Sequence, residues 1–169
     1  GAAREVFQEI DEALGEKLAR LIFEGPADEL MLTANTQPAL MAVSLAAMRA
    51  LDREFGVNVG KALYVAGHSL GEYSALAAAS ALTISDAAKL LRIRGTAMQA
   101  AVPVGEGAMA ALIGKVDVAT AEAIAAEGSA AGVVVVANDN NAGNVVISGD
   151  KAGIDAALAA AKAKGVRAI

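Results

Sequence analysis

The sequence GHSLG at residues 67–71 constrains this chain more than any other feature. Residues 62–66 before it are apolar, which is typical of a buried strand, and the residues after Leu70 favour a helix. A Gly-x-Ser-x-Gly sequence at a strand-to-helix turn is typical of a nucleophile elbow. Its two glycines leave room for a tight turn, so that the serine hydroxyl projects free of the backbone. We therefore expect Ser69 to be a nucleophile.

The helix after the elbow would point its N-terminal end at Ser69, where unpaired N–H groups favour a developing oxyanion. The backbone N–H of Leu70 is the first donor that we expect. His68, the one histidine of the chain, adjoins Ser69 in a turn that sends neighbouring side chains apart. We interpret His68 as a packing and hydrogen-bonding residue near the substrate rather than as a general base.

Residues 1–102 are expected to form one α/β subdomain with the elbow at its centre. Apolar periodicity and capping residues predict several helices around the predicted strand at residues 62–66. Their expected ranges are 4–14, 16–23, about 38–55 capped by Asn35 or Thr36, and 86–101 capped by Ser85. Together these elements indicate an incomplete parallel sheet of the α/β-hydrolase-like kind.

The helix at residues 86–101 places a charge, Arg94, on its apolar face. A helical projection places Arg94 on a face with apolar residues, while polar residues share a second face. The apolar face has Ala87, Leu90, Leu91, Met98 and Ala101, and the polar face has Lys89, Arg92, Thr96 and Gln99. A buried guanidinium needs an anion or several acceptors. An internal salt bridge, or a side chain that reaches solvent, is the alternative.

Residues 103–169 show a different pattern, after a linker at residues 103–107. The expected order is strand, helix, strand, strand, helix, strand, with an asparagine-rich hairpin loop at residues 138–143. This order is that of a ferredoxin-like α+β subdomain.

Composition excludes several classes of function. The net charge of -5 and the absence of a basic run argue against nucleic acid as a partner. The longest uncharged stretch, residues 30–48, is interrupted by cap and turn residues, so we expect no membrane span. With no cysteine and one histidine, we expect no metal site and a cytoplasmic location.

Four stretches closely resemble bacterial malonyl-CoA:acyl carrier protein transacylases of type II fatty-acid synthesis. They are TQPAL at 36–40, GHSLGEYSAL at 67–76, RIRGTAMQAAVPVGEGAMAALIG at 92–114, and AND-N with VVISG at 137–149. Gly-x-Ser-x-Gly alone is shared with unrelated esterases and lipases. The arginine 25 residues after the serine (94 minus 69), together with the following linker, makes the resemblance specific.

The resemblance implies an acyltransferase in which Ser69 takes malonyl from coenzyme A and passes it to the phosphopantetheine thiol of acyl carrier protein. It implies that Arg94 binds the malonyl carboxylate, which agrees with the geometry of a guanidinium fork. Gln37, Met98, Asn138 and Asn140 match positions at or near the acyl site. The resemblance implies no metal and no prosthetic group, with the coenzyme A thioester as substrate.

Family members also carry a GQGSQ motif near their N-terminus and an FHS-type motif, with the general-base histidine, after the small domain. Neither motif is in these 169 residues, so we expect an internal fragment with about half of the usual enzyme. Two other functions stay open at this point. One is a serine esterase, against which Arg94 argues, and the other is a remnant that only binds coenzyme A or carrier protein.

Overall fold

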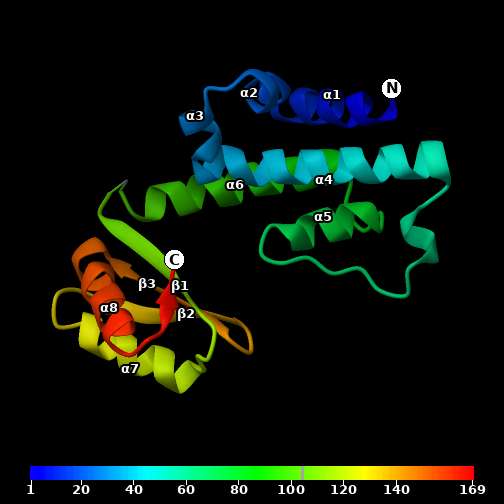
Figure 1. Cartoon of the computed structure of the whole chain (residues 1–169). Helices are drawn as coiled ribbons and strands as arrows, with labels where there is room; N and C mark the ends of the chain where they lie inside the picture. Colours follow the sequence, from blue (N-terminus) through cyan, green and yellow to red (C-terminus); the bar gives the residue numbers. More distant parts are fainter. Residues whose placement is uncertain (104) are drawn as a thin grey trace. The chain divides into compact units, whose positions relative to one another are not determined.

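The computed structural model describes residues 1–103 and 105–169, and it divides into two compact units, residues 1–101 and residues 102–169 (Figure 1). Residue 104 of the predicted linker lies outside the described residues. No helix in the described part of the chain is long and apolar enough to cross a membrane.

The first unit is built from helices. In chain order they are α1 (Ala2–Leu14), α2 (Leu18–Glu24), α3 (Ala27–Met31), α4 (Thr33–Phe55), the 3₁₀ turn η1 (Val59–Lys61), α5 (Gly71–Ala78) and α6 (Ile84–Ala101). Helices α1, α4 and α6 pack against one another, and α5 packs against α4 and α6 (Figure 1). Their shared core is mostly alanine and aliphatic: Val6, Ile10, Leu18, Ala39, Met41, Ala42, Leu45, Ala46, Ala77, Ala87, Ala88 and Leu91. Small residues on facing helices let α4 and α6 approach closely.

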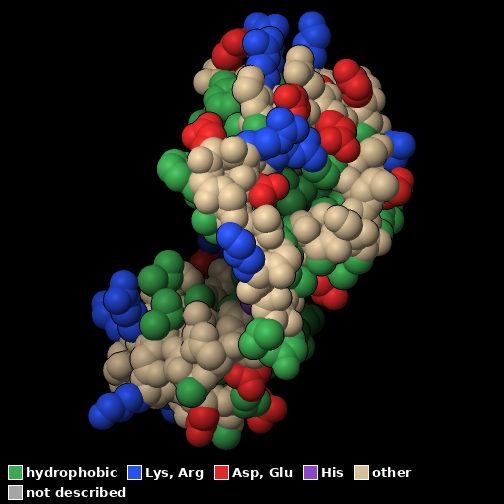
Figure 2. Space-filling model, turned by 90° about the vertical axis from the view of Figure 1, so that its right-hand side faces the viewer, with side chains coloured by type: hydrophobic (Ala, Val, Ile, Leu, Met, Phe, Trp, Pro, Cys, Tyr) green, Lys and Arg blue, Asp and Glu red, His purple; other side chains and the backbone are tan. Residues whose placement is uncertain are grey.

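On the face shown in Figure 2, acidic and basic side chains are interspersed. Ion pairs at the surface, the partly exposed Arg49 with Glu9 and the exposed Arg53 with Glu5, join α4 to α1. Pairs of this kind add little stability, so the apolar contacts hold these helices together.

The start of α6 differs from the sequence prediction. Its side-chain cap is Thr83 rather than Ser85: the Asp86 N–H donates to Thr83 Oγ1 at 2.9 Å, and the Thr83 hydroxyl donates to Asp86 Oδ2 at 2.8 Å. This pair resembles a capping box, except that the Asp86 carboxylate accepts from the Thr83 hydroxyl and not from the Thr83 N–H. The long helix likewise begins at Thr33 and contains Pro38 in its interior.

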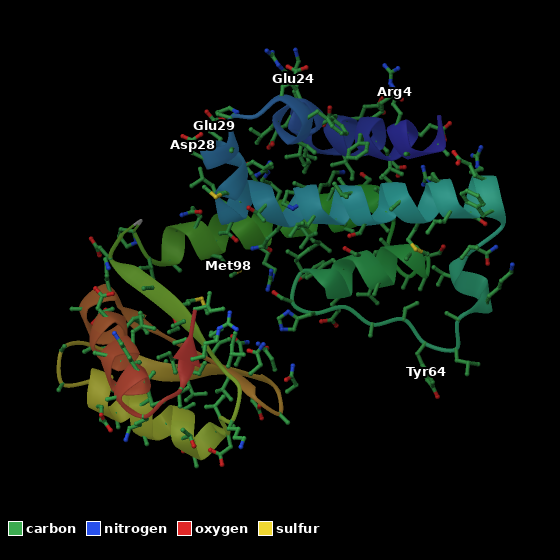
Figure 3. The ribbon with its side chains drawn as sticks, in the orientation of Figure 1. Arg4, Glu24, Asp28, Glu29, Tyr64 and Met98 are labelled. Atoms are coloured by element: carbon green, nitrogen blue, oxygen red, sulfur yellow. The ribbon has the colours of Figure 1, made fainter. Side chains whose placement is uncertain are left out.

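The predicted strand at residues 62–66 is not formed, and no strand is present in residues 1–101. This segment is an exposed connection, with Leu63 93% and Tyr64 90% exposed; the side chain of Tyr64 points away from the helices (Figure 3). A strand is stable only when neighbouring strands take up its N–H and C=O groups, and residues 1–101 supply none. The expected parallel sheet is therefore absent from the described residues.

The second unit has a four-stranded antiparallel sheet. Its elements are β1 (Gly107–Ile113), α7 (Val118–Gly128), β2 (Val134–Asn141), β3 (Asn144–Asp150), α8 (Lys151–Ala163) and β4 (Arg167–Ala168), and the strand order is β2-β3-β1-β4. Alternate residues of β1, such as Ala110 and Leu112, are buried in a core shared with α7 and α8, while Met109 is exposed. The period-two pattern of the sequence thus gives a sheet with one helix-covered face.

The hairpin between β2 and β3 is tighter than predicted. Strand β2 continues through the asparagine-rich segment to Asn141, which pairs with Asn144. The connection is therefore Ala142-Gly143, and Gly143 has a φ of 87°, as a tight hairpin turn requires. Two register irregularities in β2, between Val136 and Asn138 and between Asp139 and Asn141, accommodate the polar residues in the strand.

Candidate active site

The residues around Ser69 form a strained turn. Ser69 has a φ of 54°, in the left-handed region that residues other than glycine rarely adopt. The Gly71 N–H donates to the His68 carbonyl at 2.8 Å and the Glu72 N–H donates to the Ser69 carbonyl at 3.2 Å, which leads directly into α5. Strain of this kind persists where the surroundings fix it, and it occurs most often at functional sites. The elbow is present although the strand before it is not.

Only one of the two motif glycines is required for space. A Cβ at Gly67 would lie 1.9 Å from both the carbonyl carbon and the oxygen of Gly71, and 2.4 Å from the Glu72 nitrogen. A Cβ at Gly71 would meet nothing within 4 Å outside its own helix and chain neighbours. The expectation that both glycines prevent a collision is confirmed for Gly67 and is wrong for Gly71 within this structure.

Arg94 contacts the predicted nucleophile directly. Its Nη2 donates to Ser69 Oγ at 3.0 Å, and its Nη1 donates to Oε1 of Gln37 in a short hydrogen bond. The guanidinium of α6 therefore bridges the elbow and α4. The sequence predicted an anion or several acceptors for Arg94, and the structure shows the second arrangement, with two neutral acceptors.

Gln37 is the buried anchor of this network. It is only 3% exposed, and its Nε2 donates to Thr33 Oγ1 at 2.9 Å and to the Met98 sulfur at 3.3 Å. Since both amide hydrogens are directed to these partners, the amide oxygen is turned toward Arg94. Four of the residues predicted from the sequence, Gln37, Ser69, Arg94 and Met98, thus come together.

The helical projection of α6 was partly wrong. The buried stripe is Ala87, Ala88, Leu91 and Gly95, whereas Leu90 is 42% and Met98 49% exposed. Arg94 lies at the edge of this stripe and is half-buried. Arg92, which was assigned to the polar face, is also half-buried, with a side chain 19% exposed. The projection was partly wrong because α6 packs against three helices, α1, α4 and α5, and so buries more than one face.

A largely apolar cavity of about 710 Å³ adjoins the elbow. It is lined by His68, Ser69 and Leu70 of the elbow and by residues of α4 and α5, among them Leu40, Ser44, Leu45 and Ser74. Concave apolar sites with a few polar groups are typical of ligand-binding regions. Leu70 is the residue immediately before α5, so its backbone N–H lies at the positive end of that helix.

The two asparagines predicted near the site lie in the second unit. Asn138 pairs in register with Val146, and Asn140 Nδ2 donates to Asn144 Oδ1 at 3.4 Å across the hairpin. Both belong to β2 rather than to a loop. Their role toward substrate stays a prediction.

Thr33 and Arg92 were not identified from the sequence. Thr33 precedes Gln37 by one helical turn, so the spacing of the two polar residues could have indicated their contact. Arg92 is separated from Gly95 by one turn of α6, and a glycine inside a helix signals a close crossing. Among the described residues, no group of three His, Cys, Asp or Glu side chains could hold a metal ion.

Comparison with known proteins identifies the family. The family model described as acyl transferase domain matches residues 1–169. The chain belongs to this family. A curated relative, the malonyl CoA-acyl carrier protein transacylase of Bacillus subtilis (strain 168), is 53% identical over 113 residues, which cover 67% of this chain and 34% of that protein. The resemblance inferred from the sequence motifs is confirmed.

Solved structures agree with the fold. The crystal structure of acyl-carrier-protein-S-malonyltransferase from Bartonella henselae is 56% identical with a TM-score of 0.88, and it covers 99% of this chain and 54% of that one. A type II PKS acyl-carrier protein in complex with its malonyl-transacylase gives 40% identity and a TM-score of 0.85, over 99% and 53% of the two chains. The chain thus spans about half the length of these structures, and a smaller share of the curated relative.

Proposed function

We propose that this chain carries the nucleophile and the carboxylate clamp of a malonyl-CoA:acyl carrier protein transacylase. The observation that supports this most is the contact of Arg94 with Ser69, at 3.0 Å, together with the anchoring of Arg94 by buried Gln37. A guanidinium beside a nucleophilic serine suits an acyl group that ends in a carboxylate. The names of the relatives, malonyl transacylases and malonyltransferases, agree with this assignment.

In the proposed reaction, Ser69 Oγ attacks the thioester carbonyl of malonyl-CoA. The carbonyl becomes a tetrahedral oxyanion, the C–S bond breaks, and coenzyme A leaves as a thiol with the proton that Ser69 has lost. The phosphopantetheine thiol of acyl carrier protein then attacks the malonyl ester, and Ser69 Oγ regains a proton as the C–O bond breaks. The general base for these transfers is the histidine of the FHS-type motif that the resemblance implies.

Two features of the first unit would stabilise the charges of this reaction. The Leu70 N–H, at the positive end of α5, would donate to the oxyanion. The malonyl carboxylate lies only a few bonds from Oγ in the ester, so that Arg94 can exchange the serine hydroxyl for the carboxylate by a side-chain rotation. An acetyl group offers no such partner, and Arg94 therefore selects malonyl.

The parts of the chain follow the same assignment. Residues 1–102 form the elbow-bearing part of an α/β-hydrolase-like large subdomain, and residues 103–169 form a ferredoxin-like small subdomain. The order β2-β3-β1-β4, with its two helices, supports the second assignment. His68 and Met98 of the first unit would contact the acyl group, and the roles of Asn138 and Asn140 stay a prediction. The chemistry needs neither a metal nor a prosthetic group, and the cytoplasmic location stays a prediction.

Intact-protein mass spectrometry tests this function on these residues within a chain that also carries the FHS-type motif, because the proposed general base lies in that motif. We expect malonyl-CoA to add one malonyl group, and Ser69→Ala to abolish the adduct. Arg94→Ala should slow malonyl transfer by about a hundredfold, because a charge-assisted bidentate contact contributes roughly 1.5–3 kcal/mol, while acetyl transfer should change by less than about threefold. Equal losses for the two acyl groups would exclude Arg94 as the carboxylate clamp. Coenzyme A binding without any adduct would instead favour a binding remnant.

A further inference from the structure

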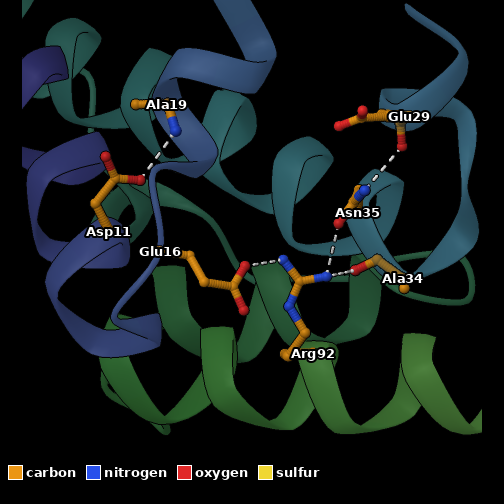
Figure 4. A network of polar contacts seen from close by, with 7 residues as sticks. All are labelled: Asp11, Glu16, Ala19, Glu29, Ala34, Asn35 and Arg92. Carbon is orange, nitrogen blue, oxygen red and sulfur yellow. Dashed lines mark hydrogen bonds and ion pairs between the residues drawn. The ribbon is translucent and has the colours of Figure 1, made fainter. Parts of the chain in front are cut away.

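Arg92 forms a polar network two residues before the clamp. Its Nη1 donates to the Ala34 carbonyl and, at 2.8 Å, to Asn35 Oδ1, while its Nη2 pairs with Glu16 (Figure 4). Asn35 in turn donates to the Glu29 carbonyl at 2.8 Å. One side chain of α6 thus contacts both the first turn of α4 and Glu16 in the connection between α1 and α2.

The partner of Arg92 in α4 is a carbonyl that lacks its usual donor. In a helix the carbonyl of residue i accepts from the N–H of residue i+4, so that Ala34 would accept from residue 38. Residue 38 is a proline inside α4, and proline has no N–H. The Ala34 carbonyl is therefore left open by Pro38, and the Arg92 guanidinium occupies it.

Two rows of α6 face the same turn of α4. The row Arg92, Gly95 and Gln99 holds its backbone: Gly95 is so close that a Cβ would lie 2.8 Å from both Ala34 Cα and Thr33 O, and Gln99 Oε1 accepts from the Thr33 N–H at 3.2 Å. Arg94 and Met98, each one residue before Gly95 and Gln99, form the adjacent row and contact Gln37. The backbone that the first row fixes carries the glutamine that the second row uses.

Arg92 is poorly suited to a purely stabilising role. Its Nε is buried and has no hydrogen-bond partner among the described residues, so its desolvation is only partly compensated. An incompletely satisfied buried guanidinium adds little or nothing to stability compared with an apolar side chain of similar size. A role in placing other groups explains its position better.

We propose that Arg92 is a positioning residue: by replacing the N–H that Pro38 lacks, it fixes the first turn of α4, and through it the orientation of Gln37 and Arg94 toward Ser69. The effect on acyl selection rests on the proposed function, whereas the effect on the orientation of Gln37 does not. The proposal predicts a specific coupling between Arg92 and Pro38, because an alanine at position 38 would restore the missing N–H.

The test compares Arg92→Met, Pro38→Ala and the double variant with the parent chain. The first measurement is NMR of the ¹⁵N-labelled side chains of Gln37 and Arg94, which needs no substrate. We expect Arg92→Met to shift both signals and the double variant to return them toward those of Pro38→Ala. Arg53→Met, an exposed arginine at the other end of α4, is the matched control and should leave them unchanged.

The second measurement is the ratio of malonyl to acetyl transfer onto Ser69, made in a chain that also carries the FHS-type motif. We expect it to fall about tenfold in Arg92→Met and about threefold or less when Pro38→Ala is also present, a coupling within the range of double-mutant cycles for residues in contact. If Arg92→Met does not fold, Arg92→Lys takes its place, because the one nitrogen of an ammonium does not reproduce the two separated nitrogens by which Arg92 contacts α4 and Glu16.

The outcomes separate this proposal from the function itself. Unchanged Gln37 and Arg94 signals in Arg92→Met, or effects of the two substitutions that simply add, would overturn the positioning role. Changed signals with an unchanged acyl ratio would also overturn it, since the network would then support the helix without affecting selection. A parent chain that also carries the FHS-type motif and transfers neither acyl group would refute the proposed function, and the NMR result would still decide whether Arg92 orients Gln37.

Discussion

Gly67→Ala should disrupt the elbow because the new methyl group would collide with backbone. Gly67 is not among the glycines with positive φ, so it is required for space and not for its backbone angles. Its Cβ would lie 1.9 Å from the carbonyl carbon and oxygen of Gly71. These atoms begin α5, and no side-chain rotation can remove them from the path of the methyl group.

The size of the collision sets the expected effect. Ordinary contact begins at 3.4 Å, so the two segments must separate by about 1.5 Å (3.4 minus 1.9). If half of this displacement reaches Ser69 Oγ, its distance to Arg94 grows from 3.0 Å to about 3.7 Å, which is outside hydrogen-bond range. Overpacking of this kind costs about 1–3 kcal/mol of unfolding free energy, and a misplacement of about 1 Å can cost about a hundredfold in rate.

Gly71→Ala is the matched control, because it makes the same substitution in the same motif where the structure leaves open space. We expect Gly67→Ala to lower the free energy of unfolding in urea by about 1–3 kcal/mol and the rate of Ser69 acylation by about a hundredfold. Gly71→Ala should change the unfolding free energy by no more than about 0.5 kcal/mol. Equal effects of the two substitutions would show that the collision at Gly67 does not determine the shape of the elbow.

Two further predictions concern the helices of the two units. Asp117 accepts hydrogen bonds from the Thr120 side chain and from the Thr120 N–H at the start of α7, and these two hydrogen bonds, the side-chain one first, hold the pKa of its carboxyl below the ordinary value of 3.8. The pKa of Asp117 is thus lower in the folded than in the unfolded chain, so the cap stabilises the fold above the unfolded pKa, and this stabilisation is lost as pH falls through the folded pKa. Hydrogen exchange of the α7 amides should therefore become faster below about pH 4. Asp117→Asn should remove this pH dependence. Gly95→Ala should lower the unfolding free energy by about 1–3 kcal/mol, since the new Cβ would collide with Ala34 and Thr33. Helix propensity alone predicts a higher unfolding free energy for alanine, so an increase would argue against the close crossing of α4 and α6.

The helices and the second unit could be predicted well because their signals are local. Gly15 and Gly56 end α1 and α4 in left-handed conformations, as glycines after an amphipathic helix predict. The alternation of β1 and the turn after β2 likewise give the antiparallel sheet. The errors at helix starts, such as Ser85 in place of Thr83, come from choosing between adjacent capping residues.

The strand at residues 62–66 could not be predicted correctly from its own apolarity. A buried strand and an exposed extended segment share the same sequence pattern, and only hydrogen-bonding neighbours decide between them. The contact of Arg92 with Ala34 was also outside the reach of pattern analysis, because a helical projection gives the faces of α6 but not which helix lies against each face. Both errors concern long-range partners.

The difference between local and long-range determinants also explains why the candidate site is present without a sheet. Ser69 is set by a turn whose hydrogen bonds span three residues, and Arg94 is set by the crossing of α4 and α6 at Gly95. Neither requires a strand from residues 62–66. The contacts of Arg94 with Ser69 and Gln37 therefore come from three helices and one turn, all within residues 1–101. A sheet on the exposed side of residues 62–66 would restrain the elbow further, but the direction in which Arg94 points is already determined by Gln37.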